Sequence, residues 1–283
     1  MGVRVQELLD TAIRQLERTS GSARADAEIL LAHCLQKSRT WLFIWPEKEI
    51  ASTTTTQFLN LIAKRTTGTP IAHLTGQREF WTLTLKVTPD TLIPRPETEL
   101  LVETALSLLP APLADTPSVL DLGTGTGAIA LSIASERPDI SVTACDFSPA
   151  ALAVAQENAQ TNHIRNVQFH PSDWFSALPP QPFDLIVSNP PYIETNDPHL
   201  LQGDVRFEPI SALASGKDGL DDIRRIVQEA PQWLKPDGWL LLEHGYNQGK
   251  AVTELLRAAG FTQVRCLPDL AGNDRVSIGQ LPG

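Results

Sequence analysis

The sequence predicts an α/β domain with a mostly parallel sheet and helices on both faces, preceded by a small helical bundle. From residue 119 onward, short apolar runs alternate with helical patterns, which is typical of strands joined by crossover helices. In the first 75 residues, apolar positions recur at helical spacing instead. We therefore predict a helical bundle over residues 1–75, a β-hairpin linker over residues 76–95 and the α/β domain over residues 96–283.

Length and composition exclude several classes of protein. The chain has 283 residues, more than one ordinary domain, and its 42% of hydrophobic residues suffices for a substantial core. The three cysteines lie far apart without a C-x-x-C pair, so we expect reduced, buried thiols in a cytoplasmic protein, with no disulfide framework and no metal site. No apolar run reaches 18 residues, which argues against a membrane span.

The net charge of −10 is concentrated in the second part of the chain. Residues 1–80 carry ten Lys and Arg against eight Asp and Glu, whereas residues 81–283 carry 13 against 25. A strongly acidic α/β domain is a poor electrostatic partner for a nucleic-acid backbone. The charge therefore favours a basic protein as the partner.

The bundle and the linker are predicted from local patterns. Helices are expected over residues 3–19, 22–35, 40–45 and 53–67. Residues 80–87 alternate like a strand, as one arm of a hairpin. Pro96 then suits the first position of a helix that runs to Leu109. Arg95 stands between two prolines, and a rigid loop that presents one guanidinium suggests contact with a ligand.

A glycine-rich loop follows the first buried strand of the α/β domain. The strand over residues 119–122 leads into Gly123-Thr124-Gly125-Thr126-Gly127, and a helix over residues 128–136 follows. A strand, a glycine loop and a helix form a ligand-binding crossover. The spacing differs from the G-x-G-x-x-G of dinucleotide folds, and the Lys-Ser/Thr of a phosphate loop is missing. The glycines allow a ligand to lie directly on the backbone without requiring a phosphate.

Acidic residues also follow the next two strands. Asp146 ends the strand over residues 140–145, where an acid typically accepts hydrogen bonds from ribose hydroxyls. It could instead cap the helix over residues 150–162, but Ser148 can supply that cap and leave Asp146 for a ligand. Beyond a strand over residues 167–170, Asp173 and Trp174 could bind the amino group and the ring of an adenine.

The stretch with the most specific chemistry is Asn189-Pro190-Pro191-Tyr192, directly after a buried strand over residues 183–187. Two prolines cannot continue a sheet, so the strand ends abruptly beside an amide side chain, rigid carbonyls and an aromatic ring. This set suits a planar NH2 group, whose two hydrogens the asparagine oxygen and a proline carbonyl can accept. A proline loop with an asparagine that only caps the strand is the alternative.

The rest of the chain completes the alternation. A long polar loop is expected over residues 193–220, with helices at 221–234 and 248–259 and strands at 238–243, 261–267 and 275–279. This pattern again predicts a mostly parallel sheet covered by helices on both faces.

Three of these motifs together resemble class I S-adenosylmethionine-dependent methyltransferases of amino nitrogens: Asp121 to Gly127, Asp146, and Asn189 to Tyr192. That resemblance implies a Rossmann-like, mostly parallel seven-stranded sheet. Residues 93–99, Glu208-Pro209, residues 216–219 and the amino-terminal helical domain narrow it to the PrmC/HemK family. Those enzymes N5-methylate the glutamine of the Gly-Gly-Gln motif in class I peptide chain release factors.

The resemblance implies a role for each motif. Gly123, Thr124, Gly125, Thr126 and Gly127 would line the methionine part of S-adenosylmethionine, Asp146 would hold its ribose, and Asp173 and Trp174 would bind its adenine. Asn189, Pro190 and Tyr192 would act in catalysis, with Asn189 also near the cofactor. Together with Pro191 and Arg95 they would bind the glutamine substrate, and S-adenosylhomocysteine would be the product.

The expected partner is a class I release factor, which the helical domain would help to bind. We expect a monomer that binds neither a membrane nor a nucleic acid. An adenine-N6 methyltransferase of nucleic acid is the alternative enzyme, and a basic target-recognition segment, which the sequence lacks, would favour it. A cofactor-binding protein without catalysis is the alternative from another class, and the loss of Asn189 or of the glycine loop would favour that one.

Overall fold

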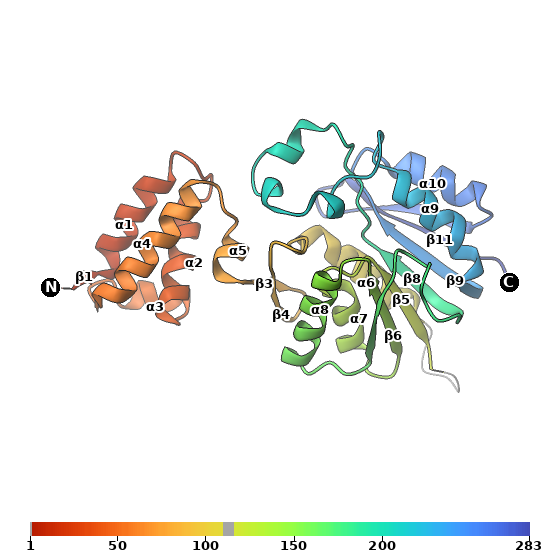
Figure 1. The fold of residues 1–283 in the computed structure, drawn as a ribbon, viewed down its shortest axis with the longest axis horizontal. Coiled ribbons are helices and arrows are strands. Elements are labelled where there is room, and N and C mark those ends of the chain that lie inside the picture. The colour runs from red at the N-terminus through yellow and green to blue at the C-terminus, as the bar shows by residue number, and fades with distance from the viewer. Residues whose placement is uncertain (1, 110–115) are drawn as a thin grey trace. The chain divides into compact units, whose positions relative to one another are not determined.

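A computed structural model describes residues 2–109 and 116–283 of the chain. Contacts divide these residues into two compact units. The helical unit comprises the residues up to Gln77 together with Leu201–Phe207, and the sheet unit comprises Arg78–Leu200 and Glu208–Gly283. Figure 1 labels helices and strands of both units where there is room.

The helical unit packs around one apolar core. Its helices are α1 (Val5–Leu16), α2 (Ala23–Leu35), α3 (Arg39–Ile44), α4 (Ser52–Thr66) and α5 (Ile71–Thr75), and the two-residue strands β1 (Val3–Arg4) and β2 (Glu49–Ile50) pair antiparallel. The predicted helices are confirmed, each with ends within about three residues of the expected ones. Leu16 of α1, Leu30 of α2 and Phe58 of α4 are fully buried in the shared core, because helical spacing puts apolar side chains on one face of each helix.

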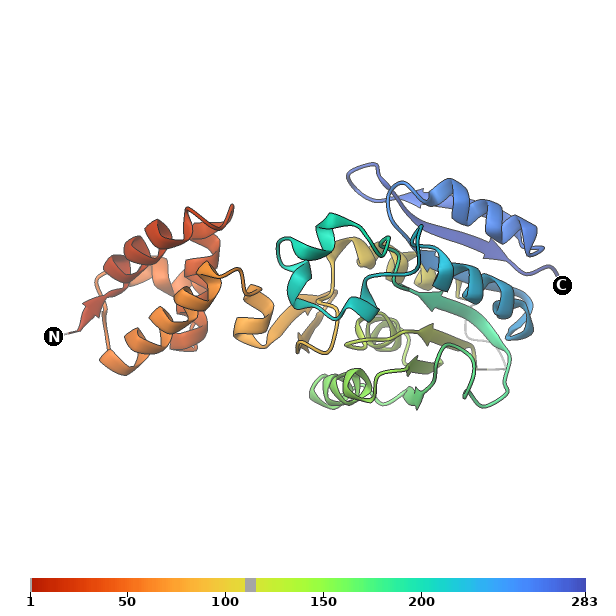
Figure 2. The same ribbon diagram turned by 45° about the horizontal axis from the view of Figure 1, so that its top comes forward.

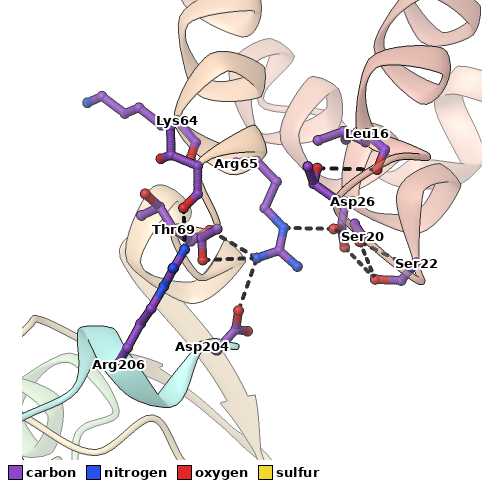
Figure 3. A network of polar contacts seen from close by, with 12 residues as sticks. Leu16, Ser20, Ser22, Asp26, Lys64, Arg65, Thr69, Asp204 and Arg206 are labelled. Atoms are coloured by element: carbon purple, nitrogen blue, oxygen red, sulfur yellow. Dashed lines mark hydrogen bonds and ion pairs between the residues drawn. The ribbon is translucent and has the colours of Figure 1, made fainter. Parts of the chain in front are cut away.

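Arg65, near the end of α4, is the centre of a polar network in the helical unit (Figure 3). Its Nε donates to Asp26 at 2.8 Å, and its side chain is only 12% exposed. Its Nη1 donates both to the carbonyl of Thr69 and to the carboxylate of Asp204, each at 3.1 Å. Arg206 donates to the carbonyl of Thr67. These bonds attach the segment Leu201–Phe207 to the end of α4.

The hairpin begins earlier than the sequence suggested. The antiparallel strands β3 (Gln77–Phe80) and β4 (Leu83–Lys86) form it, so the strand predicted over residues 80–87 contains the turn. Trp81 has a φ of 55°, in the left-handed region, and this reverses the chain direction. Apolar and polar residues continue to alternate across the turn, so the sequence pattern gave no sign of it.

A seven-stranded sheet organises the sheet unit, in the order β10-β11-β9-β8-β5-β6-β7. Figure 2 shows the same ribbon in a turned view. The strands are β5 (Ser118–Leu122), β6 (Ser141–Asp146), β7 (Val167–Pro171), β8 (Phe183–Ser188), β9 (Leu234–Glu243), β10 (Thr262–Pro268) and β11 (Asp274–Gln280). The pairs from β9 to β7 are parallel, and β11 runs antiparallel to β9 and β10. The mostly parallel seven-stranded sheet predicted for a class I methyltransferase is therefore confirmed.

Helices cover both faces of the sheet, as predicted. The core on one face joins strand residues such as Val119 and Leu185 to α6 (Glu99–Leu108), α7 (Ala128–Glu136) and α8 (Pro149–Thr161). The core on the other face joins Leu120 and Ile186 to α9 (Asp221–Glu229) and α10 (Gly249–Ala258). Successive strand side chains alternate between the two cores because a strand has a period of two.

One predicted helix is too long. The helix expected over residues 221–234 ends at Glu229, a 3₁₀ helix follows over Ala230–Gln232, and β9 already starts at Leu234. Pro231 explains the difference, because its ring excludes the helical hydrogen bond and clashes with the preceding turn. The loop expected over residues 193–220 contains short 3₁₀ helices at Pro198–Leu201, Val205–Phe207 and Ile210–Ala212, and a further one at Pro96–Thr98 precedes α6.

The three cysteines are free, and Cys145 is buried whereas Cys34 and Cys266 are only partly so. Across residues 2–109 and 116–283, no cluster of His, Cys, Asp and Glu is arranged to hold a metal ion. Within the same described ranges, no helix combines the length and the apolar character that crossing a membrane requires.

Arg65 should matter to stability mainly because of Asp26, whose side chain is only 6% exposed. In Arg65→Met the carboxylate of Asp26 stays buried without its cation, so we expect the helical unit to lose about 3 kcal/mol of stability. Asp204→Asn is the matched control: the side chain of Asp204 is 46% exposed, and its loss should cost below about 1 kcal/mol. Hydrogen exchange of the α2 and α4 amides in the full chain measures both. Equal costs would contradict this account.

Candidate active site

A cavity of about 790 Å³ in the sheet unit lies where β5, β6 and β8 end. In parallel sheets this edge is where ligands bind, because the loops after neighbouring strands converge there. The cavity is lined by these residues predicted for the site: Arg95, Gly123, Thr124, Gly125, Thr126, Asp146, Asp173, Trp174, Asn189 and Pro191. Gly127, Pro190 and Tyr192 belong to the same loops but lie outside the lining.

The glycine loop requires glycine at specific positions. Gly125 has a φ of 55°, and a Cβ built on it would meet no atom within 4 Å, so its backbone is open to a ligand. Gly127 has a φ of 83°, and a Cβ there would approach the side chains of Leu131 and Ala155 at 3.0 and 3.2 Å. Gly125 therefore keeps the loop accessible, and Gly127 lets α7 begin close to α8.

Asp121 holds the glycine loop in place through hydrogen bonds. Its Oδ2 accepts from the Thr124 hydroxyl at 2.6 Å and from the Ala130 N–H at 3.2 Å, which ties the loop to α7. Its Oδ1 is buried and has no hydrogen-bond partner among the described residues. Burial raises the pKa of Asp121 to about 7, against the lowering effect of its two hydrogen bonds.

Asp146, at the end of β6, faces the same loop. Its Oδ2 accepts from the Gly125 N–H and its Oδ1 from the Ser148 N–H, each at 2.9 Å. The Ser148 hydroxyl accepts from the Ala151 N–H at 3.3 Å and caps α8, so the cap is supplied by Ser148 as predicted. Burial raises the pKa of Asp146. The structure thus places a carboxylate on the cavity wall, and its bond to ribose stays a prediction.

Trp174 forms another part of the wall. Its φ of 51° is left-handed, and its indole Nε1 donates to Asp222 at 3.1 Å. A Cβ on Gly123 would come within 3.3 Å of the Trp174 ring, so the ring lies against the glycine loop. Asp173, by contrast, accepts from Arg225 with both oxygens at 2.9 Å. Its assignment to adenine stays a prediction, and that contact would compete with Arg225.

Asn189 is oriented by a neighbour from another element. Its Nδ2 donates to the hydroxyl of Thr98 at 3.3 Å. Because the nitrogen is occupied in this way, the amide oxygen is the end that can accept from a ligand. Pro190 is buried, and the Tyr192 N–H donates to the carbonyl of Leu213 at 3.1 Å. Asn189 thus turns its Nδ2 toward Thr98 at the cavity wall.

Arg95 lines the cavity but is not free. Its guanidinium donates to Glu208, whose side chain is completely buried. Glu208 also accepts from the backbone N–H of Ile93 at 2.9 Å. The carboxylate of Glu208 therefore fixes the loop that carries Arg95.

Several residues of the site were missed from the sequence. Phe147, next to Asp146, lines the cavity with a 60% exposed side chain, and Thr98 and Asp222 orient Asn189 and Trp174. Glu243, at the end of β9, is 1% exposed and accepts from the Tyr192 hydroxyl. An acid that ends an apolar strand, as Asp146 also does, was the signal that could have found Glu243.

Known proteins resemble this chain in sequence. Residues 97–202 match the Methyltransferase small domain family, and residues 7–76 match the PrmC N-terminal domain family. The Release factor glutamine methyltransferase of Pseudomonas aeruginosa is 56% identical, covering 92% of this chain and 94% of its own. That of Salmonella typhimurium is 52% identical, covering 97% and 98%.

This chain belongs to the release factor glutamine methyltransferase family. The resemblance to the PrmC/HemK family read from the motifs is therefore confirmed. A solved methyltransferase structure from Pyrococcus furiosus, 18% identical, matches with a TM-score of 0.54 over 82% of this chain and 100% of its own. At that identity it supports the class I methyltransferase fold of this family member.

The buried Asp121 predicts a pH dependence of stability. Its pKa is about 7 in the folded chain against an ordinary value of 3.8, so the folded state binds the proton more tightly than the unfolded state. Its contribution to stability is therefore present below pH 3.8 and is lost as the pH rises toward 7. Between pH 5 and pH 8 we expect a loss of about 2–3 kcal/mol from this group.

Asp121→Asn cannot ionise and should flatten that part of the profile. Denaturant unfolding of the wild type and the variant at both pH values measures the difference. Equal pH dependence in the two proteins would show that Asp121 does not titrate in this range.

Proposed function

We propose that this chain transfers a methyl group from S-adenosylmethionine to the side-chain amide nitrogen, N5, of the glutamine in the Gly-Gly-Gln motif of class I peptide chain release factors. The observation that carries the proposal is the orientation of Asn189, whose Nδ2 is engaged by Thr98 beside a cavity walled by the glycine loop. Family membership supports it, since both of the close relatives described above are named for this reaction.

The residues at the ends of β5 and β6 fit S-adenosylmethionine. The backbone of Gly125 is open, the Asp146 carboxylate lies beside it, and Phe147 and Trp174 offer aromatic surface to an adenine. The cavity volume of about 790 Å³ suits a ligand of this size. When bound, S-adenosylmethionine supplies an electrophilic methyl carbon.

Asn189 and its neighbours provide what an amide nucleophile needs. The amide nitrogen of glutamine has a delocalised lone pair, and its N–H groups become stronger donors as the nitrogen gains positive charge. Asn189 Oδ1 and the carbonyl of Pro190 can accept these two hydrogens, so they stabilise the charged nitrogen more than the neutral amide. The ring of Tyr192 can pack on the flat amide. No general base is required before the nitrogen attacks.

Asn189→Ala should reduce methyl transfer at saturating cofactor by at least about 100-fold, because an oriented transition-state hydrogen bond is lost. Mass spectrometry of a purified release factor, after incubation with enzyme and S-adenosylmethionine, measures the methyl group on the Gly-Gly-Gln glutamine. Asn162→Ala is the matched control, since Asn162 bonds the hairpin carbonyl of Thr84 instead, and it should retain activity.

Two results would count against the assignment. Near-wild-type methyl transfer by Asn189→Ala would contradict the proposed mechanism. A release factor that stays unmodified by wild-type enzyme, while an adenine-containing oligonucleotide gains a methyl group, would favour the nucleic-acid alternative.

We also propose that the helical unit binds the release factor away from the glutamine. Phe43, Ile44 and Trp45 are consecutive and 61%, 60% and 53% exposed, although apolar side chains of this size are usually buried. Exposed apolar residues that lie together are typical of protein interaction sites. A short loop around the glutamine offers little area of its own, so a second surface would add affinity.

A double variant, Phe43→Ser with Trp45→Ser, should lower kcat/KM on the intact release factor by at least about tenfold, because it removes two large apolar side chains of the proposed interface. On a short Gly-Gly-Gln peptide, which is too small to reach this surface, kcat/KM should stay unchanged. Leu270→Ser, a change at a fully exposed leucine of the sheet unit, is the control and should alter neither value. Equal losses on protein and peptide would show that the patch supports folding instead.

A further inference from the structure

Glu243 is a buried carboxyl that the proposed reaction has not yet used. It ends β9 and is 1% exposed. In the parallel pairing of β8 with β9, Ser188 is opposite Leu242, so the next residues of the two strands, Asn189 and Glu243, are neighbours at the edge of the sheet. Burying a carboxyl is costly unless it makes specific interactions, so its partners indicate its role.

Those partners belong to the proposed substrate site. The Tyr192 hydroxyl donates to Glu243 Oε1 at 3.4 Å. Burial raises the pKa of Glu243 to about 7, and Thr98, Arg275 and Tyr192 act in the opposite direction. The Thr98 side chain is one of these neighbours, and its hydroxyl accepts from Asn189 Nδ2 at 3.3 Å, whereas Glu243 Oε2 has no hydrogen-bond partner among the described residues. Glu243 therefore has both Tyr192 and the partner of Asn189 beside it.

We propose that Glu243 is a positioning residue for methyl transfer, which holds the hydroxyls of Thr98 and Tyr192 and through them orients the Asn189 amide and the Tyr192 ring. This inference rests on the proposed function of the site. Glu243 is only 1% exposed, so it acts through these two neighbours and not on the substrate itself.

The direction of the Thr98 hydroxyl explains why a carboxyl is needed. A hydroxyl has one hydrogen, and it can either donate or accept toward Asn189. When its hydrogen points to Glu243, only its lone pairs face Asn189, and these select the Nδ2 end. Asn189 then presents Oδ1 to the substrate. Without the carboxyl, Thr98 could donate to Asn189 Oδ1, and the amide could turn its NH2 toward the NH2 of the glutamine, where two donors would meet.

Glu243→Gln tests this role, because it keeps the shape but replaces a carboxyl oxygen with an NH2 group that can donate to Thr98. On a short Gly-Gly-Gln peptide we expect kcat to fall by about tenfold, less than for direct loss of a transition-state contact. The Kd for S-adenosylmethionine should stay within about twofold of the wild type, as the glycine loop and Asp146 are untouched. If Glu243 served folding alone, the variant would not lower kcat while leaving the Kd for S-adenosylmethionine unchanged.

Asp184→Asn is the matched control. Asp184 lies near the opposite end of β8, where it accepts from the Ser118 N–H at 2.7 Å and from Lys235 at 2.8 Å. Its loss removes a carboxylate from the same sheet without reaching the edge that carries Asn189, so kcat should be unchanged.

A mutant cycle tests whether Glu243 acts on kcat through the hydroxyls of Thr98 and Tyr192. In a Thr98→Val, Tyr192→Phe background both hydroxyls are gone, and Glu243→Gln should then cause no further loss of kcat. A further tenfold loss in that background, or an unchanged kcat for Glu243→Gln alone, would overturn the proposal. If Glu243→Gln does not fold, Thr98→Val alone tests the same path, and an unchanged kcat would again overturn it. Absence of methyl transfer by wild-type enzyme would instead contradict the proposed function.

Discussion

The parallel pairing of β5 with β6 and β8 is the constraint on which the site depends. It brings the three strand ends to one edge, where the backbone would otherwise lack partners. The glycine loop fills this need: Thr124 N–H donates to the Cys145 carbonyl at 2.9 Å, and Gly125 N–H donates to Asp146. On the other side, the Ser188 hydroxyl donates to the Leu122 carbonyl at 2.8 Å. These hydrogen bonds therefore hold the glycine loop against the ends of the strands.

Three buried acids follow from that geometry. Asp121, Asp146 and Glu243 each stand at or near the end of a parallel strand, and burial raises the pKa of all three. Local donors offset part of this cost: backbone N–H groups for Asp146, a hydroxyl and an N–H for Asp121, and the Tyr192 hydroxyl for Glu243. Burying these carboxyl groups lowers the stability of the fold, but it gives the loops beyond the sheet defined orientations. Perturbed pKa values commonly cluster at functional sites in this way.

The sequence predicts features that depend on neighbours along the chain, and it fails where distant residues meet. The glycine loop, the strand ends and the Ser148 cap are local, and the structure has them where expected. The turn at Trp81 was hidden because alternation continued through it. The pairs of Asp173 with Arg225 and of Arg95 with Glu208 join residues 52 and 113 positions apart. No periodicity reports such pairs, so the sequence showed Asp173 and Arg95 as free to bind ligands.

The long loop after Tyr192 depends on residues at the end of α4. Its middle segment, Leu201–Phe207, belongs to the helical unit by its contacts, and it is held by Arg65 and by the carbonyl of Thr67. A chain without its first 75 residues would leave Asp204 and Arg206 without these partners. The loop that starts directly after Tyr192 would then change together with the loss of the surface. Reduced activity of a shortened chain would therefore not separate release-factor binding from order in this loop, whereas substitutions of exposed side chains in the full chain leave the Arg65 network intact.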